Sequence, residues 1–524
     1  MESKLKNLLA QNVGITVATD MLYMVSRFFL PPLILSHISI EAYGIWSICF
    51  ILIGYVGMSA IGVSNVYLRF IAEYSTKNQP RKINKLITTG LFTTFFIGCL
   101  ILAAVWITLP NLIALFNISP DLQTPAKVLI FATCATFIAH LSLGSFTYVL
   151  EGLQQFTPGK VIWAMSFLLE GLLIFVFLNL NYGLYALVYA FTTRYAISIV
   201  FSYLACRRYL PTLSLHPRNF DRDMLRLFFN YGGIVQITGF LSMILRSIEK
   251  ALSSFFLGVS ATGLFEIGEK LPIMANSIPH CIAGPILPAI SHLHAKGLKD
   301  QIIQLYLKSA RYMALLSGLI MGFLAAFASP IIQAWIGTEP QYTAAATILA
   351  IFTLPFQMEM LTAPGSAVHQ GVEQPTRTLR YPLYQLGSVA ICVSIAFVLF
   401  SPSIETISYG VGLGMIISAI AYIIYTNALL ALSQKQFFTR VLLPSLIPYV
   451  LGFVSQLIFQ PAFAWAGPNR FTIACVILIA GSVYALLCSL FIYHFILKPD
   501  ERNECQTQLT RLLSKVYPIK GALT

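Results

Sequence analysis

The sequence has few charged residues and no long polar segment. Asp, Glu, Lys and Arg make up only 10% of the 524 residues, whereas 57% are hydrophobic and the mean hydropathy is +0.77. Soluble globular proteins carry about 25% charged residues. The scarcity of charge therefore excludes a soluble globular protein and predicts a polytopic membrane protein. The longest loop predicted to face outward, residues 110–127, is too short for a separate catalytic surface, which disfavours a membrane polymerase or ligase.

Motifs for disulfides, metals and nucleotides are also missing. The nine cysteines form no C-x-x-C pair, and the closest histidines, His292 and His294, have no neighbouring carboxylate or cysteine ligand. Residues 152–160 end like a phosphate-binding loop, but six residues separate Gly152 from Gly159 where four are required. We therefore expect no metal, no cofactor and no ATPase site, and we expect that the chain is not an enzyme.

Long apolar runs account for most of the chain. A run of about 20 apolar residues is long enough to cross the hydrocarbon core of a bilayer. The sequence predicts an all-α fold with fourteen such transmembrane helices. They lie near residues 12–36, 43–65, 86–109, 126–150, 160–179, 183–205, 228–256, 262–290, 308–329, 342–368, 378–400, 406–430, 441–460 and 471–497.

Basic residues exceed acidic ones, 33 to 20, but their distribution argues against nucleic-acid binding. Outside the predicted spans they fall in loops of one parity, and Lys127 and Arg470 are the exceptions. Cytoplasmic loops of membrane proteins are enriched in Lys and Arg. The pattern therefore predicts that both termini are cytoplasmic.

Two segments repeat with one constant shift along the chain. Residues 12–46 align without a gap over residues 231–265, and the polar loop at 152–157 aligns over 371–376. We call the shift from residue 12 to residue 231 the repeat offset. The identities include Gly14/Gly233, Ile15/Ile234, Thr19/Thr238, Leu22/Leu241, Met24/Met243, Arg27/Arg246, Leu33/Leu252, Ala42/Ala261, Gly44/Gly263, Gly152/Gly371, Gln155/Gln374 and Thr157/Thr376. This pattern predicts an internal duplication.

The duplication predicts two six-helix lobes. Because six is even, both copies enter the membrane in the same direction, and an axis along the membrane normal relates them. Two extra transmembrane helices follow. The predicted parts are an N-terminal lobe (1–206), a basic cytoplasmic linker (207–227), a C-terminal lobe (228–430), the two extra helices (431–497) and a cytoplasmic tail (498–524).

Arg27 and Arg246 occupy equivalent positions in the first helix of each lobe. A charge inside a membrane costs about 2.5 to 3.5 kcal/mol on insertion scales, so it usually faces a partner, a polar cavity or a ligand. One interpretation is that the two guanidinium groups converge on an anion, since arginine binds phosphate oxygens bidentately. The structural alternative pairs Arg246 with Glu249 at i,i+3 and directs Arg27 towards Asp20.

The other intramembrane charges leave the same choice open. Glu266 and Lys270 form an i,i+4 pair in the favourable order, which explains both structurally, and Lys250 can snorkel to the interface. Four further residues have no partner on their own helix, and each is either half of an interhelical pair or a proton or sodium site. These are Asp20, Glu170, Arg194 and Glu359.

Several motifs resemble a known family. They are EAYGIWS (41–47), LEGLQQF (150–156), TGLFEIGEKLPIM (262–274) and PILPAISHLHAKG (285–297). They are similar to the polysaccharide-transport branch, the O-antigen and exopolysaccharide flippases, of the multidrug/oligosaccharidyl-lipid/polysaccharide exporter superfamily. The resemblance, together with the fourteen-span plan, covers the whole chain.

The resemblance implies a flippase in the cytoplasmic (inner) membrane. Such a protein moves a polyprenyl-diphosphate-linked oligosaccharide across the bilayer by alternating access of two helix bundles. Its partners would be membrane lipids, H+ or Na+ as coupling ion, and other polysaccharide assembly proteins. Candidate substrate-binding residues are Arg27, Arg246, Lys250 and Arg194, and candidate ion-coupling residues are Asp20 and Glu359. Buried acids also leave open an ion-coupled exporter of organic cations, in which Asp20 would couple protons.

Overall fold

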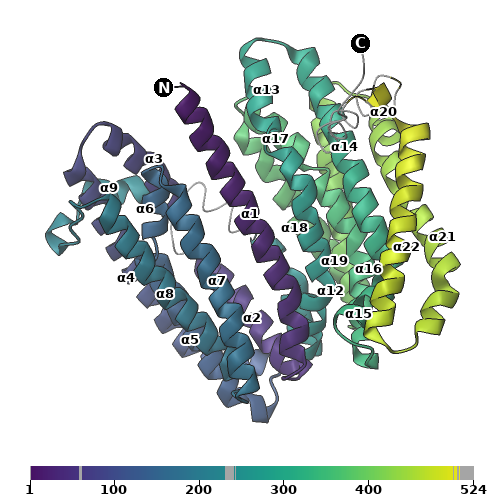
Figure 1. The fold of residues 1–524 in the computed structure, drawn as a ribbon, viewed down its shortest axis with the longest axis horizontal. Coiled ribbons are helices and arrows are strands. Elements are labelled where there is room, and N and C mark those ends of the chain that lie inside the picture. Colours follow the sequence, from purple (N-terminus) through teal and green to yellow (C-terminus); the bar gives the residue numbers. More distant parts are fainter. Residues whose placement is uncertain are drawn as a thin grey trace, which may run out of the picture. The chain divides into compact units, whose positions relative to one another are not determined.

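The structure, a computed structural model, describes residues 2–57, 62–229, 241, 243–497, 499, 501–503 and 507. These residues form helices and no β-strand, as predicted (Figure 1). The helices are α1 (Glu2–Leu35), α2 (Ile40–Gly57), α3 (Val63–Thr76), α4 (Pro80–Leu115), α5 (Pro120–Leu143), α6 (Phe146–Gly152), α7 (Phe156–Asn179), α8 (Tyr185–Tyr209), α9 (Arg222–Leu227), α11 (Ile248–Leu257), α12 (Val259–Ala283), α13 (Ile286–Ala295), α14 (Lys299–Ala326), α15 (Ala328–Trp335), α16 (Thr343–Met360), α17 (Ala363–Gly371), α18 (Arg380–Leu399), α19 (Ile404–Leu429), α20 (Gln434–Phe437), α21 (Leu443–Ala466) and α22 (Arg470–Phe491).

Eleven helices in the described part of the chain are long and apolar enough to cross a membrane. The all-α polytopic class is therefore confirmed, whereas the predicted number of fourteen spans is not. The predicted spans outside this set, 12–36, 228–256 and 262–290, each carry two or three charged residues. Residues 230–240, within the second of these spans, lie outside the described residues.

The chain divides into two compact units. The first comprises residues 1–270 and 378–418, and the second comprises 271–377 and 419–524. In the first unit α4, α5, α7 and α8 lie side by side, and α1 packs on α7 (Figure 1). In the second unit α14 packs against α16 and α21. The division into two six-helix lobes remains a prediction.

The same local packing occurs at positions related by the repeat offset. In the first unit α6 packs on α3, and in the second α17 packs on α13. A Cβ atom added to Gly152 would lie 2.9 Å from Ile71 Cβ, and one added to Gly371 would lie 3.0 Å from Ile290 Cβ. Both glycines therefore allow the same close helix contact, and both contacts obey the shift read from the sequence.

The first turns of α2 and α12 contact each other reciprocally within the first unit. A Cβ atom on Gly44 would overlap the carbonyl oxygen of Val259, and one on Gly263 would lie 2.8 Å from that of Ile40. Ile40 and Val259 are themselves related by the repeat offset. Gly44 thus contacts the counterpart of Ile40, and Ile40 contacts the counterpart of Gly44. A reciprocal contact of this kind is typical of an interface with twofold symmetry. This contact supports the proposed parallel repeat.

Candidate functional site

Two buried arginines share one carboxylate in the first unit. Glu170 of α7 is fully buried, and its Oε2 accepts hydrogen bonds from Arg27 Nη2 at 2.5 Å and from Arg194 Nη1 at 2.9 Å. The three helices α1, α7 and α8 supply one residue each. Two cations against one anion leave an excess positive charge in this arginine cluster (Arg27, Glu170 and Arg194).

Aromatic rings surround the arginine cluster. The Cζ atom of Arg27 lies 5.0 Å from the ring centroid of Tyr23, and that of Arg194 lies 4.7 Å from Tyr195. A guanidinium over an aromatic face is attracted by the ring quadrupole, more strongly where water is excluded. The aromatic neighbours therefore stabilise the two cations that a single carboxylate leaves incompletely neutralised.

A second group of charges lies where α11 meets α12. Lys250 Nζ donates to Glu266 Oε2 at 2.7 Å and lies 3.6 Å from Glu269 Oε2. Lys270 Nζ donates to Glu266 Oε1 at 2.8 Å. Glu249 is buried on α11 in the same region. We call these five residues the lysine–glutamate cluster, and its acids outnumber its cations.

Both clusters border one cavity of about 250 Å³ inside the first unit. Arg27 reaches it from α1, and Glu266 and Lys270 reach it from α12. The remaining lining residues are mainly aromatic or apolar: Tyr23, Leu30, Pro31, Ile34, Tyr43, Trp46, Ser47, Phe50 and Ile174. A small cavity with cations, one carboxylate and aromatic walls can bind a polar headgroup through charge and stacking.

The predicted pairings have different outcomes. The i,i+4 pair of Glu266 and Lys270 is confirmed. The alternative that directed Arg27 towards Asp20 is wrong, because Arg27 binds Glu170 on another helix. Asp20 instead lies 3.9 Å from Lys160 Nζ, with 53% of its side chain exposed.

Arg246 lies in the turn before α11 and is exposed. In the described part of the chain no ion pair joins it to Glu249, so the predicted i,i+3 pair is absent there. Arg246 does not line the cavity that contains Arg27. Glu359 is partly buried near the end of α16 and belongs to the second unit.

Two features of the site were not predicted. Glu170 was recognised as a charge without a partner on its helix, but its place between two arginines depends on the packing of three helices. Lys270 was explained as half of a structural pair, yet it also borders the cavity. A signal was available for Glu170, because Arg194 likewise had no partner on its own helix. Within the described residues, no group of three or more His, Cys, Asp or Glu side chains is placed to hold a metal ion.

Comparison with known proteins identifies the family. A family model described as "Polysaccharide biosynthesis protein" matches residues 37–346. The uncharacterized membrane protein EpsK of Bacillus subtilis is 20% identical over 341 residues, which cover 65% of this chain and 67% of EpsK. A putative O-antigen transporter of Shigella flexneri is 21% identical over 334 residues, covering 63% of this chain and 77% of the transporter.

Solved structures share the fold. The lipid II flippase MurJ, in an inward closed conformation, matches with a TM-score of 0.69 at 14% identity, over 93% of this chain and all of that one. An inward-facing multidrug resistance MATE transporter of the MOP superfamily matches with a TM-score of 0.68 at 12% identity, over 79% and 94%. These names describe a flippase and a transporter, in agreement with the prediction that the chain is not an enzyme. Because the family model covers more than half of the sequence, the chain belongs to the polysaccharide biosynthesis protein family, the polysaccharide-transport branch that its motifs resemble.

Proposed function

We propose that the chain is a flippase for a polyprenyl-diphosphate-linked oligosaccharide, the repeat unit of a surface polysaccharide. It would move this lipid from the inner to the outer leaflet of the cytoplasmic membrane by alternating access. Membership of the polysaccharide biosynthesis family supports this proposal. The names of two similar proteins, an O-antigen transporter and a lipid II flippase, agree with it.

The arginine cluster beside the cavity is the observation that carries the proposal. Arg27 and Arg194 share the single carboxylate of Glu170, so one positive charge is left over beside the cavity. Arg27 Nε is buried and has no hydrogen-bond partner among the described residues. A diphosphate would supply both the missing charge and the missing acceptor, and guanidinium groups bind phosphate with strong charge-assisted hydrogen bonds.

The size of the cavity indicates which part of the substrate it holds. Its volume of about 250 Å³ is below the roughly 300–1,000 Å³ typical of drug-sized ligand sites. We therefore place the diphosphate and at most the first sugar here, the sugar against Tyr43 and Trp46. The polyprenyl tail would remain in lipid, and H+ or Na+ coupling through Asp20 or Glu359 remains part of the proposal.

The alternative is an ion-coupled exporter of organic cations. Glu266 favours it, because this carboxylate borders the cavity and could attract a cation. However, Lys250 and Lys270 both donate to Glu266, so the charge that faces the cavity is largely neutralised. Replacing Glu266 therefore separates the two functions.

Purified protein in proteoliposomes with a fluorescent polyprenyl-diphosphate oligosaccharide tests the proposal. Arg27→Gln should slow flipping by about 10-fold to 100-fold, since a hydrogen bond to a charged group contributes about 1.5 to 3 kcal/mol. Lys270→Gln should slow it as well. Lys127→Gln is the matched control, because Lys127 is exposed on α5 and lies outside this cavity. Unchanged flipping in Arg27→Gln, with loss of organic-cation export in Glu266→Gln, would replace the flippase by the exporter.

A further inference from the structure

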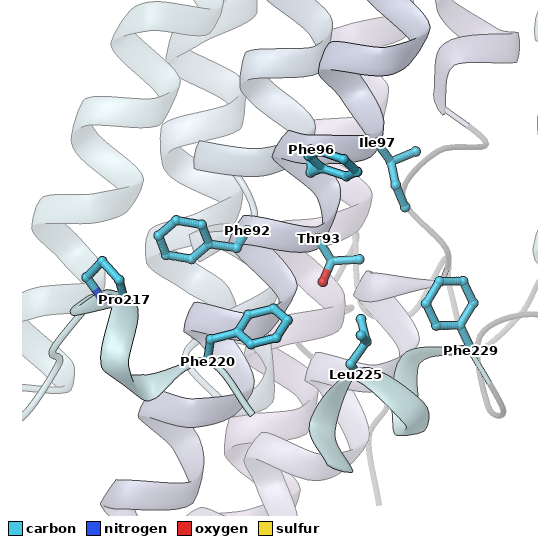
Figure 2. Close-up of a pocket in the computed structure, with 8 residues that line it drawn as sticks. All are labelled: Phe92, Thr93, Phe96, Ile97, Pro217, Phe220, Leu225 and Phe229. Carbon is cyan, nitrogen blue, oxygen red and sulfur yellow. The ribbon is translucent and has the colours of Figure 1, made fainter. Parts of the chain in front are cut away.

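A second cavity lies between α4 and the linker that follows α8, about 450 Å³ in volume. We call it the linker groove (Figure 2). One wall comes from two turns of α4, and the other comes from the linker and α9. Its lining residues are Phe92, Thr93, Phe96, Ile97, Pro217, Phe220, Leu225 and Phe229.

The linker groove offers an apolar surface that the protein itself leaves open. Phe96 is 65% exposed and Phe229 is 51% exposed, although both line the groove. Thr93, its only hydroxyl residue, donates its hydroxyl to the carbonyl of Thr89 at 2.7 Å. The hydroxyl of Thr93 therefore already has its hydrogen-bond partner within α4. No polar group of the lining needs a polar ligand, so the fitting occupant is a hydrocarbon chain.

One face of α4 changes from polar to apolar beside the groove. Asn84 Nδ2 donates to the carbonyl of Thr212 at 2.7 Å, and Lys85 Nζ donates to Asp221 Oδ2 at 2.7 Å. Thr89 Oγ1 accepts from the backbone N–H of Asp221 at 3.0 Å. Beginning at Phe92, one turn further along the helix, the side chains towards the linker are apolar. This transition matches the boundary between lipid headgroups and acyl chains.

Three exposed cations lie on the linker segment that forms one wall of the groove. Arg218, Arg222 and Arg226 are exposed, and in the described part of the chain no carboxylate forms an ion pair with any of them. Arg222 and Arg226 flank Leu225, which lines the groove. Of the nearby acids, Asp221 is occupied by Lys85, and only the exposed Asp223 remains. Clusters of Lys and Arg at a membrane surface attract anionic lipids.

We infer that the linker groove binds one acyl chain of an anionic phospholipid, with its phosphate held by Arg222 and Arg226. The lipid would join the linker to α4, since its chain touches both walls. A zwitterionic lipid would fill the same groove with its chain but would gain less from the arginines. This site is separate from the cavity at Arg27 and does not depend on the proposed flippase activity.

A second groove at the other end of α4 provides a comparison. It has a similar volume, about 480 Å³, and a similarly apolar lining that includes one cation, Lys127, among the described residues. Its residues are Trp106, Leu109, Pro110, Thr124, Lys127, Val128, Phe131 and Ala132. Apolar shape alone would load both grooves equally, whereas the linker arginines should make the linker groove more selective for anionic lipid than the second groove, which has the single cation Lys127.

Photo-crosslinking tests the inference. Full-length protein in nanodiscs is labelled with phosphatidylglycerol, or with phosphatidylcholine, each carrying a diazirine in the same acyl chain, and the labelled peptides are mapped by mass spectrometry. Phosphatidylglycerol should label residues 92–97 and 217–229 at least fivefold more than phosphatidylcholine. Arg222→Gln and Arg226→Gln should each reduce labelling about fivefold, the factor expected for one basic residue near an anionic surface.

Filling the groove provides the matched control. Thr93→Trp should abolish labelling of the linker groove, whereas Thr124→Trp, in the second groove, should leave it unchanged. Thermal unfolding checks that each variant is folded, and the two arginine variants preserve the test if Thr93→Trp is not. Equal labelling by the two lipids, or labelling that survives both arginine substitutions, would overturn the inference.

Discussion

The two repeat copies share their helix packing but bury their charges at different positions. In the first copy, Glu170 binds the arginine of α1, Arg27, and also binds Arg194. The repeat offset relates these two residues to Val389 and Leu413, which are apolar. Arg246 therefore has no counterpart of Glu170 to bind, which explains its exposure in the turn before α11. An identical residue at an equivalent position has a different environment in each copy.

The lysine–glutamate cluster shows the reverse relation. All five of its residues belong to the second copy, and four of them are Glu249, Lys250, Glu266 and Glu269. The first copy has uncharged residues at the positions equivalent to these four: Leu30, Pro31, Ser47 and Phe50. These four uncharged residues all line the cavity, together with Arg27. The charges at the cavity therefore come from non-equivalent positions, Arg27 in the first copy and Glu266 and Lys270 in the second, and the following variants test that asymmetry.

Loss of the shared carboxylate should have the largest effect. Glu170→Val copies the second repeat at one position and leaves two buried cations without an anion. Breaking a buried ion pair by removing one partner costs about 3 to 5 kcal/mol. The thermal midpoint of the purified protein should fall accordingly.

The double variant Glu170→Val/Arg194→Leu copies the second repeat at both positions. It should recover only part of the lost stability, because it removes the buried charge of Arg194 but leaves Arg27 without its carboxylate partner. If the single variant is as stable as the wild type, Glu170 does not neutralise the two arginines. The same thermal scan decides this.

Arg27 and Arg246 should differ in transport although they are equivalent in sequence. In the flipping assay, Arg246→Gln should change the rate by less than about twofold, because Arg246 lies outside the cavity and exposed charges contribute at most about 1 kcal/mol. Arg27→Gln should show the large reduction given above. Equal losses in the two variants would mean that both copies contribute to the substrate site.

The sequence predicts the internal repeat and the pairs within one helix better than the contacts between helices. Gln154 and Glu373, which the repeat offset relates, lie in the turns after α6 and α17. Both have a φ of 62°, so the structure repeats with the same shift as the sequence. The pair Glu266–Lys270 could be predicted because residues four apart share a helix face. The bond from Arg27 to Glu170 joins residues 143 apart, and no spacing rule reaches that far.

The cavity could be predicted only in part for the same reason. Arg27 was identified from its cost inside a membrane, but its orientation depends on where α7 and α8 place Glu170 and Arg194. Lys270 was assigned to its helix partner, and its second role appears only when α12 lies against α2. The side chain of Lys270 both pairs with Glu266 on its own helix and lines the cavity. A residue with a structural partner can therefore also contribute to a functional site.

Close packing at the reciprocal glycines should give a moderate destabilisation in both copies, larger at Gly44 than at Gly263. A methyl group at Gly44 or Gly263 meets the backbone of the facing helix, and overpacking of this kind costs about 1 to 3 kcal/mol. Gly44→Ala and Gly263→Ala should therefore both lower the thermal midpoint, Gly44→Ala more because its methyl group would overlap the carbonyl oxygen of Val259. Gly14→Ala is the control, because nothing lies within 4 Å of the added methyl group, and alanine favours a helix by about 0.5 to 1 kcal/mol. A drop for only one of the two glycines would contradict the twofold contact.

The ion pair between Lys85 and Asp221 should give the smallest effect. The second copy has Gln304 and Arg440 at these positions, so the pair belongs to the first copy alone. The hydrogen bond from Lys85 holds the pKa of Asp221 below its ordinary value of 3.8. A lowered pKa in the folded state means that the pair stabilises the linker above pH 3.8 and that this contribution is lost as the pH falls through the folded value.

Asp221→Asn should therefore destabilise the protein by at most about 1 kcal/mol at neutral pH, and the difference from wild type should vanish at acidic pH. Asparagine keeps the side-chain oxygen that caps α9, so the substitution removes only the charge. Thermal scans of both proteins at neutral and acidic pH measure its effect. If the two proteins differ in stability by the same amount at both pH values, the ion pair is not the cause.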